Sequence, residues 1–185
     1  MNEIEQRFRS DIQKSKKKAK AFNDYILHLI RNEHILEAEY FLAQLLELKP
    51  SNEKSLCIGY KIAIRMFNQM KVSFFDRKLC EIKAKEELIL ALRLEYYCSI
   101  NSQSNAEQYL NELLNRNSIS EDLLNLIIDA SLDTQKHRYV IRTLEHLKMH
   151  CLKPDKSTEK RFRKLLLERL VDLLKAGNNG NIQCS

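Results

Sequence analysis

Equivalent apolar residues recur along this chain at one fixed interval, and that period restricts the fold more than any other feature. Steps of 34 from Ala38 reach only small or medium-sized apolar residues: Val72, Ala106 and Val140. Two further series are apolar at every step: Leu45, Leu79, Leu113 and Leu147; and Ile26, Tyr60, Leu94, Ile128 and Phe162. A third series is apolar through Phe22, Leu56, Leu90 and Leu124 and is then broken by Thr158. A fixed interval between equivalent core positions predicts an array of equal units that stack side by side.

The composition favours helices as the content of each unit. Among the 185 residues there are only three Gly and two Pro, whereas chains built from many strands and tight turns need more of both. Apolar residues make up 44% and charged residues 30%, the ordinary balance of a globular chain. We therefore predict an all-α fold.

Two segments that lie two periods apart show the pattern in detail. EAEYFLAQLLELKP (37–50) and NAEQYLNELLNRNS (105–118) share an alanine, a glutamate, an aromatic residue and three leucines at matching places. This pattern resembles the tetratricopeptide repeat (TPR) family, whose 34-residue unit is a helix–turn–helix. Among the units the first one matches the family pattern best, with five residues in register: Phe22, Leu29, Ala38, Leu42 and Pro50. It departs from the pattern at Ile26, where the family usually has a small residue.

The resemblance implies an α-solenoid of antiparallel helix pairs, wound into a right-handed superhelix, with repeats at 19–52, 53–86, 87–120 and 121–154. It also implies that Ala38 and Ala106 are small because the two helices of a unit cross closest there. One core series has an exception, because Asp76 stands where the other units have Leu42, Leu110 and Leu144. The second unit is the weakest match, so whether residues 74–101 form two helices or one bent helix is open.

Segments outside the repeats are predicted from their charge and polarity. Residues 1–18 are expected to form a basic helix or a loose basic arm, residues 155–176 an amphipathic helix that caps the array, and residues 177–185 a disordered tail. Of the net charge of +6, residues 1–20 carry +4, residues 153–175 carry +4 and the remainder carries −2. Three polar residues that precede acids are predicted helix N-caps: Asn52, Asn105 and Ser120.

A binding surface is a further implication of the resemblance. In the resembled fold the first helix of each unit lines a concave groove, and the matching positions here are mostly charged: Lys20, Asn23, Arg31, Lys54, Lys61, Arg65, Glu95, Asn125, Asp129 and Asp133. The first two units supply the bases and the last two the acids. Such a groove would orient an extended or helical peptide by charge. The alternative is an ordinary solvated surface.

Sequence motifs for catalysis are lacking. The chain contains no glycine-rich phosphate loop, nucleophile elbow, metalloprotease helix or paired-cysteine motif. His146 and His150 lie one helical turn apart, a spacing that can hold a metal, but no second pair of ligands accompanies them. We predict no enzyme activity, no cofactor and no metal site.

Cysteine usage and hydropathy indicate the cellular compartment. The five cysteines are widely spaced and form no C-x-x-C motif, which predicts reduced thiols in a cytoplasmic protein. No stretch approaches the ~20 apolar residues of a membrane span. The first twenty residues lack the apolar core of a secretory signal.

Together these features predict a non-enzymatic module that binds an extended or helical segment of a partner protein, as an adaptor, regulator or chaperone. Bacterial secretion chaperones, which are short free-standing relatives in the resembled family, are one specific form of that function. The alternative is a nucleic-acid-binding or transcription-regulating protein that uses its basic termini, because KSKKKAK (14–20) can contact phosphates. The oligomeric state stays open, a homodimer included.

Overall fold

The computed structural model describes residues 3–14, 18–115, 125–128, 130–131, 134, 136–149, 156, 159–160, 163 and 167. The chain divides into two compact units, residues 1–109 and 110–185. In the first unit the helices are α1 (Glu3–Lys14), α2 (Lys18–Arg31), α3 (Ile35–Leu48), α4 (Glu53–Arg65), α5 (Gln69–Glu81) and α6 (Glu86–Ser99). Helix α7 (Gln103–Leu114) spans the boundary, and α9 (His137–Met149) belongs to the second unit. Within the described residues there is no strand.

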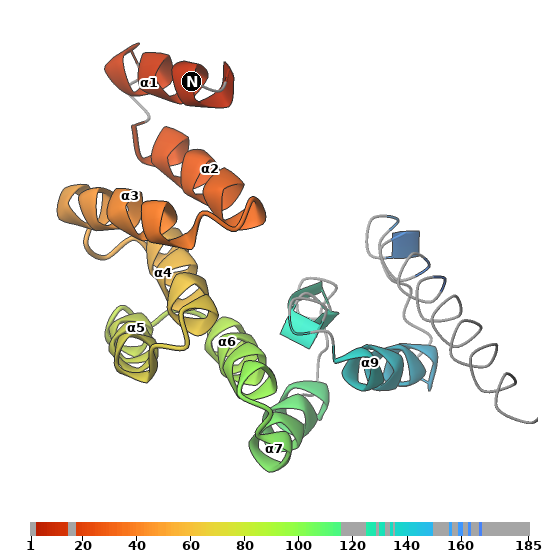
Figure 1. Ribbon diagram of the computed structural model, residues 1–185. Helices are drawn as coiled ribbons and strands as arrows, with labels where there is room; N and C mark the ends of the chain where they lie inside the picture. Colours follow the sequence, from red (N-terminus) through yellow and green to blue (C-terminus); the bar gives the residue numbers. More distant parts are fainter. Residues whose placement is uncertain are drawn as a thin grey trace, which may run out of the picture. The chain divides into compact units, whose positions relative to one another are not determined.

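Helices of the first unit pack in sequential pairs, α2 with α3 and α4 with α5, and α3 also contacts α4. The first helices of the pairs contact one another as well, α2 with α4 and α4 with α6. Figure 1 shows these three helices following one another in a row, with α3 and α5 on the same side of it. The predicted all-α array of helix pairs is therefore confirmed.

The period of the sequence is also present in the backbone of the turns. Within each pair the chain passes through one left-handed residue: Glu33 (φ 63°), Phe67 (φ 52°) and Asn101 (φ 57°). The next amide closes the turn by donating back to the end of the preceding helix: His34 N to Leu29 O at 3.0 Å, Asn68 N to Ala63 O at 3.0 Å and Ser102 N to Tyr97 O at 2.9 Å. This bond satisfies a carbonyl that the helix end would otherwise leave without a partner. Identical turns at a constant interval explain why the pairs have equal length.

Periodic apolar positions form the core. Ala38 is fully buried, and the other members of its series, Val72, Ala106 and Val140, are at most 4% exposed. Leu45, Leu79 and Leu113 are fully buried, as are Ile26, Leu94 and Ile128. Phe22, Leu42 and Leu110 are buried too, whereas Pro50 is exposed in the turn between α3 and α4. The side chains of Leu147 and Phe162 lie outside the described part.

Residues 74–101 form two helices. Helix α5 ends at Glu81 and α6 begins at Glu86. Between them Lys83 takes the left-handed conformation (φ 54°), and Ala84 N donates to Leu79 O at 3.0 Å. The boundary between the second and third repeats thus has the same closing bond as the turns within the pairs, without glycine or proline.

Two asparagines cap helices, although the sequence pointed to only one of them. Asn52 accepts from the amide of Ser55 at 3.0 Å, as predicted, and Asn68 accepts equally from Lys71 at 3.0 Å. The prediction for Asn105 was wrong, because this residue lies inside α7 and its Nδ2 donates to Ser102 Oγ at 2.9 Å. Ser120 lies outside the described residues.

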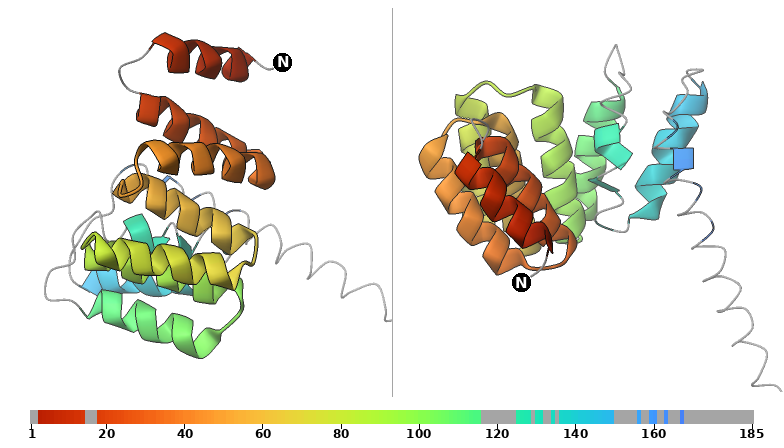
Figure 2. Two further views of the ribbon diagram at one scale, coloured as in Figure 1. Left: turned by 90° about the vertical axis from the view of Figure 1, so that its left-hand side faces the viewer. Right: turned by 90° about the horizontal axis from the view of Figure 1, so that it is seen from above.

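The N-terminal segment is a helix packed at one end of the first unit (Figures 1 and 2). Helix α1 contacts α2 and places Phe8, 7% exposed, among aromatic rings of the first pair. The ring of Phe8 stacks on Tyr25 at 4.1 Å and meets Phe22 and Phe41 edge-on, both at 5.4 Å. This cluster covers the apolar end that an array of helix pairs leaves open.

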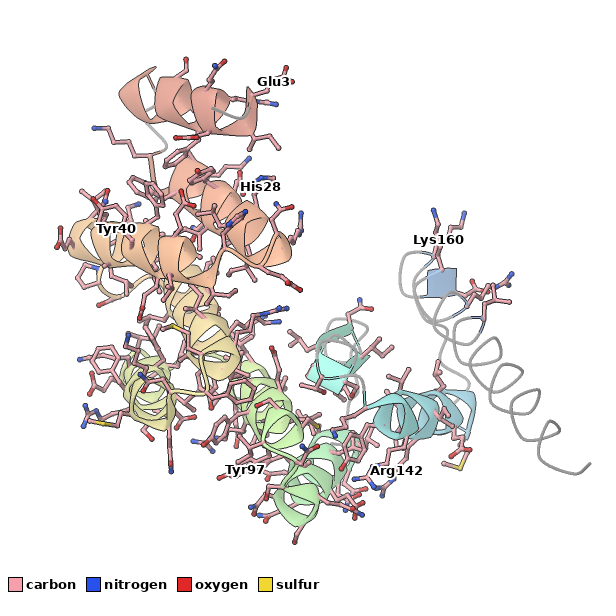
Figure 3. The ribbon with its side chains drawn as sticks, in the orientation of Figure 1. Glu3, His28, Tyr40, Tyr97, Arg142 and Lys160 are labelled. Atoms are coloured by element: carbon pink, nitrogen blue, oxygen red, sulfur yellow. The ribbon has the colours of Figure 1, made fainter. Side chains whose placement is uncertain are left out.

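In the second unit, α9 buries Val140 and Tyr139 on one face. On its other side the guanidinium of Arg142 donates to Asn111 of α7 (Figure 3). Of the predicted capping helix at 155–176 the structure describes five residues: Lys156, Glu159, Lys160, Arg163 and Leu167, all helical. The predicted tail at 177–185 lies outside the described residues.

Asp76, the exception in the leucine series, joins three helices. Its carboxylate accepts from Arg93 Nε and Nη2 of α6, both at 2.9 Å, and from the Tyr60 hydroxyl of α4 at 3.5 Å. Burial, and then the charge of Asp76, raises the pKa of Tyr60 above its usual range, and the hydrogen bond from Arg93 to Asp76 raises the pKa of Arg93. The guanidinium also lies 6.0 Å from the ring of Tyr109. A polar cluster thus replaces an apolar contact between the second and third pairs.

Asp76→Leu restores the residue that other units carry, yet it is expected to lower the free energy of unfolding by about 1–2 kcal/mol. The reason is that Arg93, only 31% exposed, would lose both bonds of its bidentate pair. Urea unfolding followed by circular dichroism measures the change. In the double variant Asp76→Leu with Arg93→Leu no charge is left unpaired, so it should be more stable than the single variant. A single variant as stable as the parent would contradict this account.

Candidate binding surface on the first helices

The row of α2, α4 and α6 carries the predicted binding positions of the first three repeats, which we call the inner surface. It is defined by Lys20, Asn23 and Arg31 on α2, Lys54, Lys61 and Arg65 on α4, and Glu95 on α6. Lys20, Arg31, Lys54 and Arg65 are exposed, Lys61 is partly buried, and Asn23 and Glu95 are buried. Some of these side chains are therefore accessible to a ligand, whereas others are enclosed within the helix array.

Four cations of the inner surface are available. Lys20, Arg31, Lys54 and Arg65 are exposed and form no ion pair with any residue that the structure describes. Lys20 and Lys54 hold the same place in successive repeats, as do Arg31 and Arg65, and their helices α2 and α4 are in contact. The eleven residues from Lys20 to Arg31 correspond to about 16 Å along a helix and return to the same helical face. Two pairs of bases thus mark the two ends of this surface.

Between these ends Leu27 of α2 adds an apolar side chain to the inner surface. Leu27 is half-buried, and Ile30 and Ile64 are 8% and 4% exposed. These side chains belong to the same hydrophobic cluster that holds the pairs together. An anionic ligand would therefore find charge at the two ends and, between them on α2, apolar contact with Leu27.

Lys61 is already paired. Its ammonium lies 3.2 Å from a carboxylate oxygen of Glu95, whose side chain is only 5% exposed. The two residues hold the same repeat position on adjacent helices, so the ion pair joins α4 to α6. Removing the charge of Lys61 would leave an enclosed carboxylate without this partner, and such a change destabilises proteins. Lys61 thus holds the array together whether or not a ligand is present.

Asn23 is likewise engaged inside the array. The hydroxyl of Ser55 on α4 lies 3.5 Å from Asn23 Oδ1 and 2.9 Å from Oδ1 of the capping residue Asn52. Asn23 is 5% exposed and Ser55 is fully buried. These bonds connect the first helices of two successive repeats, so Asn23 contributes to the packing of α2 on α4.

Cys57 lies one turn before Lys61 on α4. Burial raises the pKa of its thiol to about 12; Glu53 adds to the rise and Lys61 opposes it. The thiol is therefore protonated at neutral pH, which leaves it a poor nucleophile and a poor metal ligand. Cys57, Cys80 and Cys98 all carry free thiols.

The acidic half of the predicted groove falls largely outside the described residues. Asn125 is helical and half-buried in the second unit, whereas Asp129 and Asp133 are not described. His150, one of the two histidines weighed as metal ligands, is also outside. Across the described ranges, no group of three His, Cys, Asp or Glu side chains is placed to hold a metal.

The pairing of Lys61 with Glu95 escaped sequence analysis, although a signal for it existed. The two residues have opposite charges and stand one period apart, and equivalent positions on contacting helices are neighbours. A similar signal preceded the ion pair between Lys71 of α5 and Glu39 of α3, whose separation in the chain is close to one period. A search for opposite charges at such separations would have found both pairs.

No family model, curated protein or solved structure matches the chain. Among the helices in the described ranges, none has the length and apolar character needed to cross a membrane.

Proposed function

We propose that this chain is a cytoplasmic, TPR-like scaffold without enzymatic activity, which binds a segment of another protein across its inner surface. It would act as an adaptor, a regulator or a chaperone. The observation that carries the proposal is the set of four exposed cations, Lys20, Arg31, Lys54 and Arg65, which have no ion-pair partner among the described residues. Exposed charges without an ion-pair partner among the described residues are available to select and orient a ligand.

The ligand that we propose is an acidic segment with an apolar centre. The basic ends are about 16 Å apart along α2, and an extended chain covers about 3.3 Å per residue. Two acidic residues about five positions apart would thus reach both ends, with apolar side chains between them over Leu27. A helical segment would need its acids about eleven positions apart to span the same length.

The second candidate function, nucleic-acid binding, is favoured by the same four cations, because phosphates would neutralise them equally well. The apolar centre distinguishes the two ligands. Binding dominated by phosphate contacts collapses between low and moderate salt, whereas binding with a large apolar component persists.

Direct binding measurements test the proposal. The probes are fluorescent peptides that carry two acidic residues set two, five or eight positions apart around an apolar centre, and a single-stranded oligonucleotide of similar length. We expect the peptide with the five-residue spacing to bind best. The oligonucleotide should bind the parent no better than this peptide at moderate salt.

Arg31→Glu combined with Arg65→Glu is the informative variant. It should weaken binding of the preferred peptide by about tenfold or more, because two attractive contacts become repulsive. The matched control is Lys49→Glu with Lys85→Glu, which makes the same charge change at exposed positions in turns between repeats. Equal affinities of parent, variant and control would contradict the proposed surface. Stronger binding of the oligonucleotide, abolished by salt, would favour the nucleic-acid alternative instead.

A further inference from the structure

A second surface of the first unit exposes large apolar side chains. Helix α3 exposes Leu36 (75%) and Tyr40 (64%), and helix α5 exposes Met70 (85%) and Phe74 (42%). Phe67, in the turn that leads into α5, is 72% exposed. We call these five residues the outer patch. It lies on the second helices of two successive pairs, whereas the inner surface lies on the first helices.

Ion pairing shows that the two halves of the outer patch are neighbours. Leu36 and Tyr40 are one turn apart on one face of α3, and Met70 and Phe74 hold the same places on α5. Glu39, next to Tyr40, forms an ion pair with Lys71, next to Met70. Figure 3 shows the side chains of both helices, with Tyr40 labelled. The apolar side chains of α3 and α5 therefore lie on both sides of one ion pair.

The repeat itself does not require apolar residues at these positions. One period further along, the places of Met70 and Phe74 are taken by Ser104 and Gln108. One further period brings Arg138 and Arg142. Core positions such as Leu45 stay apolar through the same steps. The outer patch is thus a local addition to the first two pairs, and its large exposed apolar area is typical of an interaction site.

The outer patch itself carries no charge, and the charged residues at its margin are mostly paired with one another. On α3 and α5, Lys71 pairs with Glu39, Lys78 with Glu81 at 2.7 Å, Arg77 with Glu81 at 3.9 Å, and Asp76 with Arg93 of α6 at 2.9 Å. The whole chain carries +6, and four exposed bases of its inner surface have no ion-pair partner in the described part, so two copies repel each other at most orientations. At the outer patch this repulsion is weakest, because the five residues are uncharged and the neighbouring charges are mostly paired.

The exposed apolar area of the outer patch is also large enough for a contact with a second copy of this chain. At about 200 Å² per ring, the exposed fractions of Tyr40, Phe67 and Phe74 amount to roughly 350 Å². Leu36 and Met70 are the most exposed of the five and bring the total to roughly 600–700 Å². A standard protein interface buries about 800 Å² on each partner. If two copies pack patch against patch, the apolar area together with the polar residues at its margin reaches the area that a standard interface buries on each partner.

We propose that two copies of this chain associate through their outer patches. The contact is two-fold symmetric, so that the same residues of α3 and α5 meet on both chains. It leaves the inner surface of each copy free, and the dimer would therefore present two inner surfaces. This inference does not depend on what the inner surface binds.

Sedimentation velocity of the full chain over a wide concentration series tests the proposal. The parent should shift from the mass of one chain, 21.9 kDa, towards twice that mass as its concentration rises. Met70→Glu and Leu36→Glu each bury a charge at the contact, so each should raise the dissociation constant of the dimer by about tenfold or more. Both residues are largely exposed, and circular dichroism should show an unchanged fold.

Ser104→Glu is the matched control, because it places the same charge at the equivalent exposed position of the third pair. It should dimerise as the parent does. A parent that stays monomeric at every concentration would overturn the proposal. So would a dimer that neither Met70→Glu nor Leu36→Glu weakens, or a monomer whose outer patch binds lipid vesicles instead.

Discussion

Replacing Leu45 by alanine is expected to lower the free energy of unfolding by about 2–5 kcal/mol, the largest effect among the substitutions considered. Leu45 is fully buried on α3, in the cluster that includes Ile26, Leu42 and Leu56. Alanine removes three carbon atoms, and helices held in place on both sides cannot collapse fully into the space. The transfer and cavity terms therefore add. Urea unfolding monitored by circular dichroism gives the change directly.

Leu48→Ala is the control for this substitution. Leu48 ends the same helix and is 57% exposed, so the same loss of atoms should change stability by no more than about 0.5 kcal/mol. If the two alanine variants were equally stable, the assignment of Leu45 to the repeat core would be wrong.

Ala38→Leu is the second substitution with a large expected effect, a loss of about 1–3 kcal/mol in the free energy of unfolding. Ala38 is fully buried on α3, which packs against α2, so three additional carbon atoms must displace side chains of the core cluster. Overpacking of this kind forces side chains from their preferred rotamers or moves the backbone. Leucine is itself a good helix former, so helix propensity does not explain the loss.

Ala43→Leu supplies the comparison, because Ala43 is exposed on the same helix. This control should unfold at the denaturant concentration of the parent, and Ala38→Leu at a clearly lower one. Equal midpoints for the two leucine variants would show that the helices do not approach closely at Ala38.

A close approach in the second pair arose at a residue that the period did not select. Gly59 lies on α4 against the ring of Phe75 on α5, and a Cβ atom at this glycine would lie 2.4 Å from Phe75 Cε1. The sequence predicts small residues at the positions equivalent to Ala38. In the second pair this position is occupied by Val72, which is larger than alanine. The helices α4 and α5 accommodate valine there and approach closely at Gly59. Sequence alone could not locate this contact, because it depends on how far the two helices are displaced along each other.

Turn residues show a similar limit. Left-handed backbone favours glycine or asparagine, and Asn101 fits that preference. Glu33 and Phe67 adopt the same conformation at the equivalent positions in spite of their side chains. Core packing of the helices on both sides imposes the turn there, so local preference gave no signal. The period of the buried residues located these turns better than the turn residues themselves.

By itself the sequence determined the helical class, the length of the repeat and the buried series through Ala38, Leu45 and Ile26. These properties depend only on which side chains of each helix are apolar, and the spacing of apolar residues along the sequence contains that information. Tertiary structure alone decided that Arg65 has no ion-pair partner among the described residues, that Asn23 is enclosed, and that Asp76 joins three helices. Each of these outcomes depends on the distance and angle between helices, which residues far apart in the chain set together.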